Sequence, residues 1–300
     1  MIFRQTGQVV PGFHVLGNPH TPCYLLDAPR PALFDSGFSF LSRFYADHAL
    51  RVLAGRQPEI LFLTHVHFDH CGGASFLRDA FPGLRIAASA AAGEILARPR
   101  ALALMRDLNE DARRMGPDIG VPSPAVTPFQ PFEVDMLLGD GDEIDLGGGC
   151  RVRVLATPGH TRDFLSYYIP ERKILIASEA VGCADTSGRI MVEFVADYDA
   201  YLASLRRLSE LDIEVLCQGH LYVYQGPDVR EYLGRSLLET ERYCRWVGEL
   251  LDEEGGCVEG VVGRVKAAEY DPWPEPKQPE SAYLLNTTAR VRGLARRSKG

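Results

Sequence analysis

The sequence lacks two features that would assign the protein to a membrane or an exported class. It contains no stretch of about 18 uninterrupted apolar residues, the length that spans a bilayer. Its first seven residues do not combine a charged start with a sustained apolar core and a small-residue cleavage site. We therefore expect a protein that neither spans a membrane nor is exported.

Paired cysteines and an excess of basic residues are also missing. The seven cysteines are odd in number and form no C-x-x-C pair, which is typical of the reducing cytoplasm. Lysine and arginine total 32 against 40 aspartate and glutamate residues, a formal net charge of −8. Because this charge repels phosphate backbones and anionic membranes, we expect neither nucleic acid nor a membrane as partner.

The chain of 300 residues, 46% hydrophobic, is long enough for one large domain or two small ones. Short apolar runs separated by glycine and proline indicate strands in both halves, and a layered α/β architecture follows. The expected strands are 13–16, 23–26, 32–37, 60–63, 142–146, 152–155, 167–169 and 174–177, with a helix over 42–54.

Other segments show helical spacing or are rich in proline. Apolar residues recur at helical spacing between residues 91 and 115, and residues 116–131 contain five prolines, which suggests an insertion over the mouth of a site. Helical spacing returns from Val229 to Leu251. Residues 272–279 form a proline-rich connector before a last, basic helix that we expect to be a solvated face.

The most informative motif is His65-Val66-His67-Phe68-Asp69-His70, directly after the apolar run 60–63. A single histidine is more often a hydrogen-bonded core or surface residue, but packing does not require three of the eight histidines within six positions. Imidazole nitrogen and carboxylate oxygen are ligands that zinc, iron and manganese accept. The spacing lets His65 and His67 project to one side while Asp69 and His70 turn to another, so one loop can serve two ions.

Three later residues complete a candidate ligand set. His160, Glu179 and His220 each follow an apolar run that we expect to be a strand, where a side chain is free to coordinate. Taken singly, each is a weak signal. Taken together with the motif, they predict that the ligands gather along one edge of the sheets.

This pattern resembles the metallo-β-lactamase superfamily over roughly the first three quarters of the chain, with the H-x-H-x-D-H signature intact. The resemblance implies an αββα sandwich with a helical C-terminal cap, and two divalent metal ions, with zinc favoured over iron or manganese. It implies support of the metal loop by Asp35 from outside the ligand set. The implied ligands are His65, His67 and His160 for the first ion, and Asp69, His70 and His220 for the second.

One position departs from the family pattern. The family usually places a bridging aspartate where this sequence has Glu179, whose extra methylene carries the carboxylate about 1.5 Å further from the backbone. Glu179 could span both ions in an altered geometry, hold only one of them, or be a strand-end surface acid. These three alternatives stay open at this point.

The resemblance also implies a reaction type. Two cations activate a water molecule and polarise a carbonyl or phosphoryl oxygen, so hydrolysis is the expected chemistry, with Asp69 as the catalytic residue that orients the water and carries a proton. Tyr222 and Tyr224 could assist at the oxyanion, although packing is the expected role of both. Cys183 could approach the site, although a buried apolar role fits it better.

Members of the family act on thioesters, lactones, phosphodiesters and β-lactams, and some carry out diiron redox chemistry. Features of this sequence reduce the number of candidate reactions. The lack of a recognisable export signal disfavours secreted β-lactamases, the acidic charge balance disfavours nucleases, and His67 disfavours diiron oxidoreductases, which usually carry glutamate there. We therefore expect a small ester, thioester or lactone as substrate. The segment Ala196–Leu205 and the helical C-terminal cap look similar to the subgroup that includes glyoxalase-II-like enzymes and the quinolone-signal response thioesterase. The covering elements would be residues 97–131 and the helices after Val229, which implies an apolar acyl or aromatic substrate.

We therefore expect a metal-binding domain over residues 1–226, with an insertion at about 95–131, and a helical extension over 227–300. A ligand-responsive regulatory protein on the same scaffold, with vestigial hydrolysis, is the alternative. The oligomeric state cannot be read from the sequence.

Overall fold

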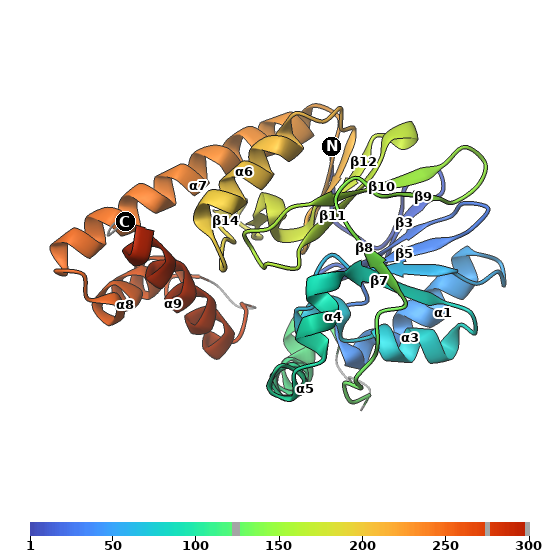
Figure 1. Ribbon diagram of the computed structural model, residues 1–300, viewed down its shortest axis with the longest axis horizontal. Helices are drawn as coiled ribbons and strands as arrows, with labels where there is room; N and C mark the ends of the chain where they lie inside the picture. Colours follow the sequence, from blue (N-terminus) through green and yellow to red (C-terminus); the bar gives the residue numbers. More distant parts are fainter. Residues whose placement is uncertain (122–126, 274–276, 298–300) are drawn as a thin grey trace.

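The computed structural model describes residues 1–121, 127–273 and 277–297 and shows two facing β-sheets with helices on both outer faces (Figure 1). Helices α1 (Ser42–Val52), α3 (Ala74–Ala80), α4 (Ala90–Leu96) and α5 (Pro99–Arg114) cover the first sheet, and α6 (Tyr198–Ser209) and α7 (Pro227–Glu253) cover the second. This arrangement confirms the expected αββα sandwich with C-terminal helices. Helices α7 to α9 extend from one end of the sandwich, in orange to red in Figure 1.

The first sheet comes from the N-terminal half of the chain. Strands β5, β6 and β7 are parallel, and β2 to β5 form antiparallel pairs. In spatial order the strands are β2 (Gly7–Val10), β3 (Phe13–Asn18), β4 (Thr21–Leu26), β5 (Ala32–Phe34), β6 (Ile60–Phe62), β7 (Arg85–Ser89) and β8 (Met136–Leu138).

The second sheet comes mainly from the later part of the chain. Strands β12 and β15 are parallel, and their neighbours are antiparallel. In spatial order the strands are β1 (Ile2–Phe3), β16 (Val223–Gln225), β15 (Val215–Cys217), β12 (Ile174–Ile176), β11 (Leu165–Ile169), β10 (Arg151–Ala156) and β9 (Glu143–Asp145). A separate hairpin pairs β13 (Cys183–Ala184) with β14 (Ile190–Met191).

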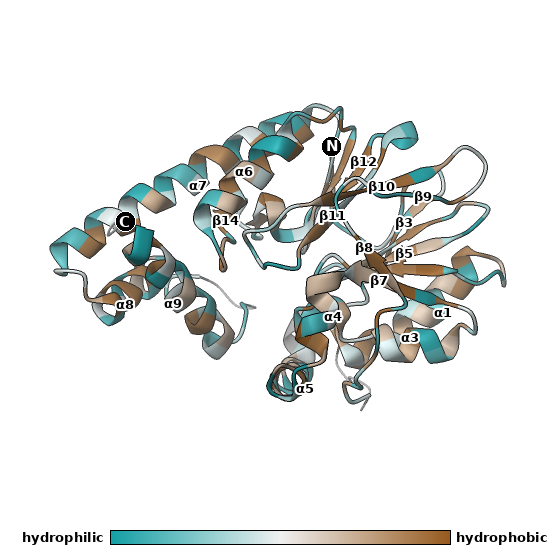
Figure 2. Cartoon of the chain, in the orientation of Figure 1, coloured by the Kyte–Doolittle hydropathy of each residue, from teal (hydrophilic) through white to brown (hydrophobic). Residues whose placement is uncertain are grey.

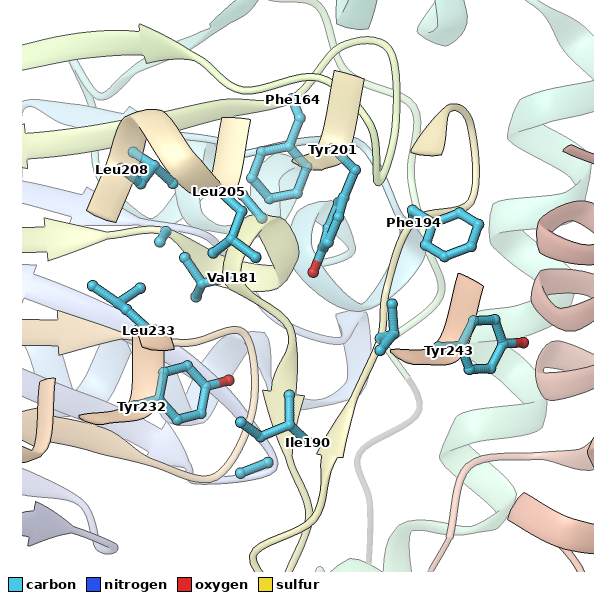
Figure 3. Packing of buried hydrophobic residues seen from close by; sticks show 14 of the residues in the cluster. Phe164, Val181, Ile190, Phe194, Tyr201, Leu205, Leu208, Tyr232, Leu233 and Tyr243 are labelled. Carbon is cyan, nitrogen blue, oxygen red and sulfur yellow. The ribbon is translucent and has the colours of Figure 1, made fainter. Parts of the chain in front are cut away.

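The strands β4, β5, β6, β11, β12 and β15 are buried along their whole length, so both of their faces are covered and most of them read as continuous apolar runs. In β6, Ile60 and Phe62 face the second sheet, whereas Leu61 faces the helices. The same alternation in β12 sends Ile174 and Ile176 between the sheets and Leu175 toward α6 and α7. Figure 2 shows the resulting concentration of apolar residues on the strands. Figure 3 shows the outer core of the second sheet.

The helices confirm most of the expected segments. The helix expected over 42–54 is α1 (Ser42–Val52), and the one that follows Val229 is α7 (Pro227–Glu253). The others are α2 (Phe68–Cys71), α3 (Ala74–Ala80), α4 (Ala90–Leu96), α5 (Pro99–Arg114), α6 (Tyr198–Ser209), α8 (Val258–Glu269) and α9 (Glu280–Arg297). In the described part of the chain, no helix has both the length and the hydropathy needed to cross a bilayer.

The stretch 91–115 differs from the single helix that its spacing suggests. It forms two helices, because Arg98 is extended and Pro99 begins α5. A residue before proline disfavours the helical region, and proline suits the first position of a helix. Residues 122–126 of the proline-rich stretch and 274–276 of the connector lie outside the described residues.

A tyrosine of the second sheet connects the two sheets beside the metal motif. The ring of Tyr167 lies 5.7 Å from that of Phe34 and 5.0 Å from that of Phe62, centre to centre. Its hydroxyl donates a hydrogen bond of 2.6 Å to the carbonyl of Leu63, two residues before His65. Packing between the sheets therefore fixes the start of the loop that carries the motif.

The Tyr167→Phe substitution removes this hydrogen bond without creating a large cavity. We expect the free energy of unfolding to fall by about 1–3 kcal/mol, because the Leu63 carbonyl loses a buried donor. Urea unfolding of the purified variant measures the change. Tyr243→Phe is the matched control, since the buried Tyr243 hydroxyl has no hydrogen-bond partner among the described residues. Equal unfolding curves for the two variants would contradict this role of Tyr167.

Candidate metal centre

The predicted ligands all follow strands of one sheet or the other. Four of them lie in the segment that follows β6 of the first sheet and ends with α2. The other three follow β10, β12 and β15 of the second sheet. Parallel pairing of β5 with β6 and of β12 with β15 brings carboxyl ends to one edge of each sheet. The structure brings together every predicted ligand: His65, His67, Asp69, His70, His160, Glu179 and His220.

The first cluster joins the two sheets through three histidines. Ring nitrogens of His65, His67 and His160 lie within 4.8 Å of one another. His67 Nδ1 is 3.1 Å from His160 Nε2, and the ring centre of His65 is 4.6 Å from that of His67. Three nitrogen donors at this spacing can hold one divalent cation.

The second cluster contains Asp69, His70 and His220, again within 4.8 Å of one another. Asp69 Oδ2 is 3.6 Å from His220 Nε2 and 3.8 Å from His70 Nε2. Glu179 lies against this cluster, with Oε1 2.9 Å from His70 Nε2 and 3.0 Å from His220 Nε2. Glu179 also groups with His65 and His70, so it connects the two clusters. This position rules out the alternative of a surface acid, since Glu179 is 3% exposed.

Backbone carbonyls set the protonation of two of the rings. His160 Nδ1 lies 2.5 Å from the carbonyl oxygen of Glu193, and His220 Nδ1 lies 2.5 Å from that of His20. A carbonyl only accepts hydrogen bonds, so each Nδ1 carries the proton. The Nε2 atom of each ring then faces its cluster, where it offers a lone pair once it has no proton of its own.

Side chains do the same for the other two buried rings. His70 Nδ1 donates to Asp35 Oδ2 over 2.9 Å. His65 Nδ1 lies 3.0 Å from the hydroxyl oxygen of Thr64, whose own proton goes to Asp35 over 2.9 Å. Asp35 therefore contacts the metal loop as the resemblance implied, both directly and through Thr64.

Two buried atoms at the centre of the site have no hydrogen-bond partner among the described residues. They are His65 Nε2 and Glu179 Oε1. Glu179 Oε1 lies 2.9 Å from His70 Nε2 and 3.0 Å from His220 Nε2, and these contacts are ion pairs only when the two nitrogens carry protons. A buried acceptor without a partner costs about 1–3 kcal/mol of folding free energy. A cation bound between these atoms would be the missing partner. The donor set therefore fits divalent cations.

Burial and charge divide the histidines into two groups. Burial lowers the pKa of His65 well below its usual value and that of His160 to about 3, so both rings are neutral. Burial also opposes charge on His70 and His220, but the nearby carboxylates together outweigh it and raise the pKa of both rings, with Glu179 as the main contributor and Asp69 the next. Burial would raise the pKa of Glu179, yet His70 and His220 hold it well below the usual range.

Left-handed backbone flanks the ligands. Among the described residues, five non-glycine positions have positive φ, and three of these are Asp35 at +56°, Ser178 at +49° and Leu221 at +66°. Ser178 precedes Glu179, and Leu221 follows His220. Such backbone costs about 1–3 kcal/mol per residue, so the surrounding packing holds the site in a strained form.

Gly219 explains how the longer glutamate fits. A Cβ atom on Gly219 would lie 2.0 Å from Glu179 Oε1, far inside contact distance. Glu179 lies on a short 3-10 helix, Ser178–Val181, and Ser178 Oγ donates to its Oε2 over 2.7 Å. The missing side chain at Gly219 thus provides the space that the additional methylene requires.

The remaining candidates are packing residues. Tyr224 stacks on Tyr232 with ring centres 4.2 Å apart, and Arg4 lies over the Tyr222 ring. Cys183 is 1% exposed. None of the candidates Tyr222, Tyr224 and Cys183 lines the cavity that contains the ligands.

Sequence reasoning missed the groups that orient the ligands. His20 and Glu193 act through backbone carbonyls, which leave no signal in residue type. Asp163 was visible as an acid three residues after His160. Its Oδ2 accepts the backbone N–H of Val66 over 2.9 Å, inside the metal motif.

A cavity of about 340 Å³ opens onto both clusters. Its lining includes His67, Asp69, His160, Glu179 and His220 together with apolar residues of α5 and α9. Helices α7 and α8 contribute no residue to this lining in the described part of the chain. Of the segments expected to cover the site, α5, α9 and the connector before α9 therefore do so.

Comparison with known proteins matches residues 17–220 to the family model of the metallo-β-lactamase superfamily. A hydroxyacylglutathione hydrolase of Ruegeria pomeroyi is 30% identical over 172 residues, 56% of this chain and 50% of the relative. The acyl-coenzyme A thioesterase MBLAC2 of Homo sapiens is 28% identical over 191 residues, 62% of this chain and 64% of the relative. The chain thus spans about half the length of the first relative and under two thirds of the second.

A solved structure gives the same fold. A metallo-β-lactamase family protein of Thermus thermophilus superposes with a TM-score of 0.67 at 22% identity, over 97% of this chain and 95% of that chain. At this identity the likeness shows the fold alone.

The close approach of Gly219 to Glu179 predicts the effect of Gly219→Ala. The added methyl group displaces the carboxylate, and we expect metal affinity to fall by about tenfold or more, as for loss of an orienting contact. Equilibrium dialysis against buffered zinc, with elemental analysis, measures this. Gly234→Ala in α7 is the matched control, since a Cβ there meets nothing within 4 Å. Unchanged zinc affinity in Gly219→Ala would show that Glu179 is not a ligand.

The division of the histidines predicts how metal-free protein titrates. We expect His70 and His220 to stay protonated above pH 6.5, and His65 and His160 to stay neutral below it, His160 down to about pH 3. Cation binding then releases protons from the second cluster, so its affinity rises with pH through these raised pKa values. Ring proton shifts in NMR spectra measure the titrations. A common midpoint near pH 6.5 for all four rings would contradict this division.

Proposed function

The chain belongs to the metallo-β-lactamase superfamily, and we propose that it is a metal-dependent hydrolase of a small ester, thioester or lactone. The observation that carries this proposal is the arrangement of the histidine rings. In four of them Nδ1 is hydrogen-bonded outside the clusters, and Nε2 faces the centre of the site. The relatives named above are hydrolases, which supports hydrolysis in general.

We propose two cation sites. His65, His67 and His160 would hold the first cation, Asp69, His70 and His220 would hold the second, and the Glu179 carboxylate is placed where it could contact both. Zinc suits this nitrogen-rich donor set, and iron and manganese are the alternatives that elemental analysis distinguishes. Bound cations supply Lewis acidity and lower the pKa of water to about 7.

Asp69 is the residue we assign to proton transfer. It belongs to the second cluster, and its side chain is 18% exposed and lines the cavity, so it reaches both the ligands and a substrate. Its carboxylate orients the attacking water, takes the water proton and returns it to the leaving group. The buried rings of His65 and His160 exclude solvent from the other side of the site.

The lining of the cavity supports an apolar acyl or aromatic substrate. Among the three bond types, the name of the relative from Homo sapiens favours a thioester. We also propose that residues 1–226 form the metal-binding domain, with an insertion at about 95–131. Residues 227–300 form the helical extension that completes the cavity through α9 and the connector.

A panel of ester, thioester, lactone and phosphodiester substrates tests the proposal on metal-loaded protein. We expect turnover of at least one carbonyl substrate, loss of turnover with a chelator, and recovery with zinc, iron or manganese. Asp69→Asn should lower kcat by about 10²–10⁴-fold, as for loss of a general base. Asp107→Asn, an exposed acid on α5, is the matched control.

Two results would contradict hydrolysis. One is no turnover of any substrate by protein shown to contain two metal ions. The other is tight binding of a small ligand without turnover under each of the three metals, which would support a ligand-responsive regulatory protein.

A further inference from the structure

Helix α5 carries two apolar stripes, and the packing of the fold uses only one of them. Met105 and Ala112 are 7% and 5% exposed and belong to the core under the first sheet. Leu102 packs against the same core. This stripe accounts for the attachment of α5 to the sandwich.

The second stripe consists of Leu104 and Leu108 of α5 and Met115, the residue that caps its C-terminus, spaced so that they share one side of the helix. All three line the cavity that contains the metal ligands. Leu104 is 48% exposed, a large apolar side chain that folding leaves in contact with water. Apolar surface that continues into a polar site is typical of a ligand-binding wall.

Apolar residues from other elements complete the same space. Phe38 and Phe68, with ring centres 5.7 Å apart, line it next to the metal motif. Leu285 of α9, which is 54% exposed, and Met191 of β14 also line it. Figure 1 shows α5 and α9 on different sides of the region between the sandwich and the C-terminal helices. An apolar group in the cavity would therefore contact α5 and α9 together.

A buried asparagine ties α5 to the metal loop. Asn109, 2% exposed, donates to the carbonyl of Phe68 over 3.2 Å and accepts the backbone N–H of Ser39 over 2.9 Å. Phe68 stands between His67 and Asp69 in the motif. These hydrogen bonds fix the distance between the second stripe and the metal ligands. A fixed distance is what a site needs if it is to distinguish substrates by the length of an apolar chain.

We propose that the stripe of Leu104, Leu108 and Met115 binds the acyl chain of the substrate and sets the longest chain accepted. This rests on the proposed hydrolase function and adds the residues that select the substrate. The acyl chain is assigned here because the turn between β13 and β14 lines the cavity with Asp185, Thr186 and Ser187, which suit a polar leaving group. At roughly 30 Å³ per water-sized group, the cavity of about 340 Å³ holds on the order of ten non-hydrogen atoms.

A series of straight-chain acyl thioesters of one thiol, from acetyl to dodecanoyl, tests the assignment. For the wild-type protein kcat/KM should rise by about fourfold per methylene until the cavity is full, and then level off. Leu108→Trp should end the rise at a shorter chain, with a loss of about tenfold or more on decanoyl relative to butanoyl. Leu104→Asn, at a half-exposed position, should reduce the increase in kcat/KM per methylene without lowering the free energy of unfolding appreciably.

Ala103→Trp is the matched control, because Ala103 lies on the exposed side of α5 outside the cavity. Its chain-length profile should equal that of the wild type. The proposal is overturned if Leu108→Trp lowers kcat/KM equally for all chain lengths. It is also overturned if the variants change the preference for the leaving thiol, measured with one acyl group on several thiols, in place of the preference for the acyl chain.

Calorimetric binding of straight-chain carboxylic acids to metal-loaded protein separates this proposal from the proposed function. Affinity that rises with chain length and loses this rise in Leu108→Trp, without turnover of any ester, thioester or lactone, supports the stripe and contradicts the hydrolase. Turnover with no dependence on acyl length supports the hydrolase and contradicts the stripe. If the protein shows no turnover and its affinity for the acids does not depend on chain length, both proposals are contradicted.

Discussion

The site depends on hydrogen bonds to the outer nitrogens of its histidines. His65, His70, His160 and His220 each direct Nδ1 to a group outside the clusters, so that Nε2 of each ring faces the centre. One of these bonds crosses between the sheets, since His220 follows a strand of the second sheet and its carbonyl partner, His20, lies between β3 and β4 of the first. The geometry of the clusters therefore depends on correct packing of the two sheets.

Several features of the site are energetically unfavourable, and the packing of the sandwich compensates for them. Buried rings, unpartnered acceptors and left-handed backbone at Ser178 and Leu221 all raise the free energy of the folded chain without metal. The apolar core between the sheets offsets them, and hydroxyl groups next to the site connect the layers. Tyr24, for example, donates to the carbonyl of Gln218 over 2.7 Å, two residues before His220. Cations would relieve part of this cost, which couples metal binding to stability.

The sequence predicted the parts of the site that depend on side-chain type. Histidines and acids after apolar runs indicated the ligands, and the αββα layers and long helices such as α7 were also predicted. The placement of Glu179 was left open because it depends on the φ angle of Ser178 and on the space beside Gly219. The orienting carbonyls of His20 and Glu193 were invisible because any residue offers a carbonyl. The break between α4 and α5 was missed by a prediction based on apolar spacing, although Pro99 marked it.

The most direct test of a paired cation site is a crystal structure of the zinc-loaded protein with anomalous diffraction at the zinc edge. We predict two anomalous peaks, each about 2.0–2.2 Å from its ligand atoms. One peak should lie among His65, His67 and His160, and the other among Asp69, His70 and His220. An anomalous map without peaks between these side chains, from crystals with excess zinc, would contradict the account.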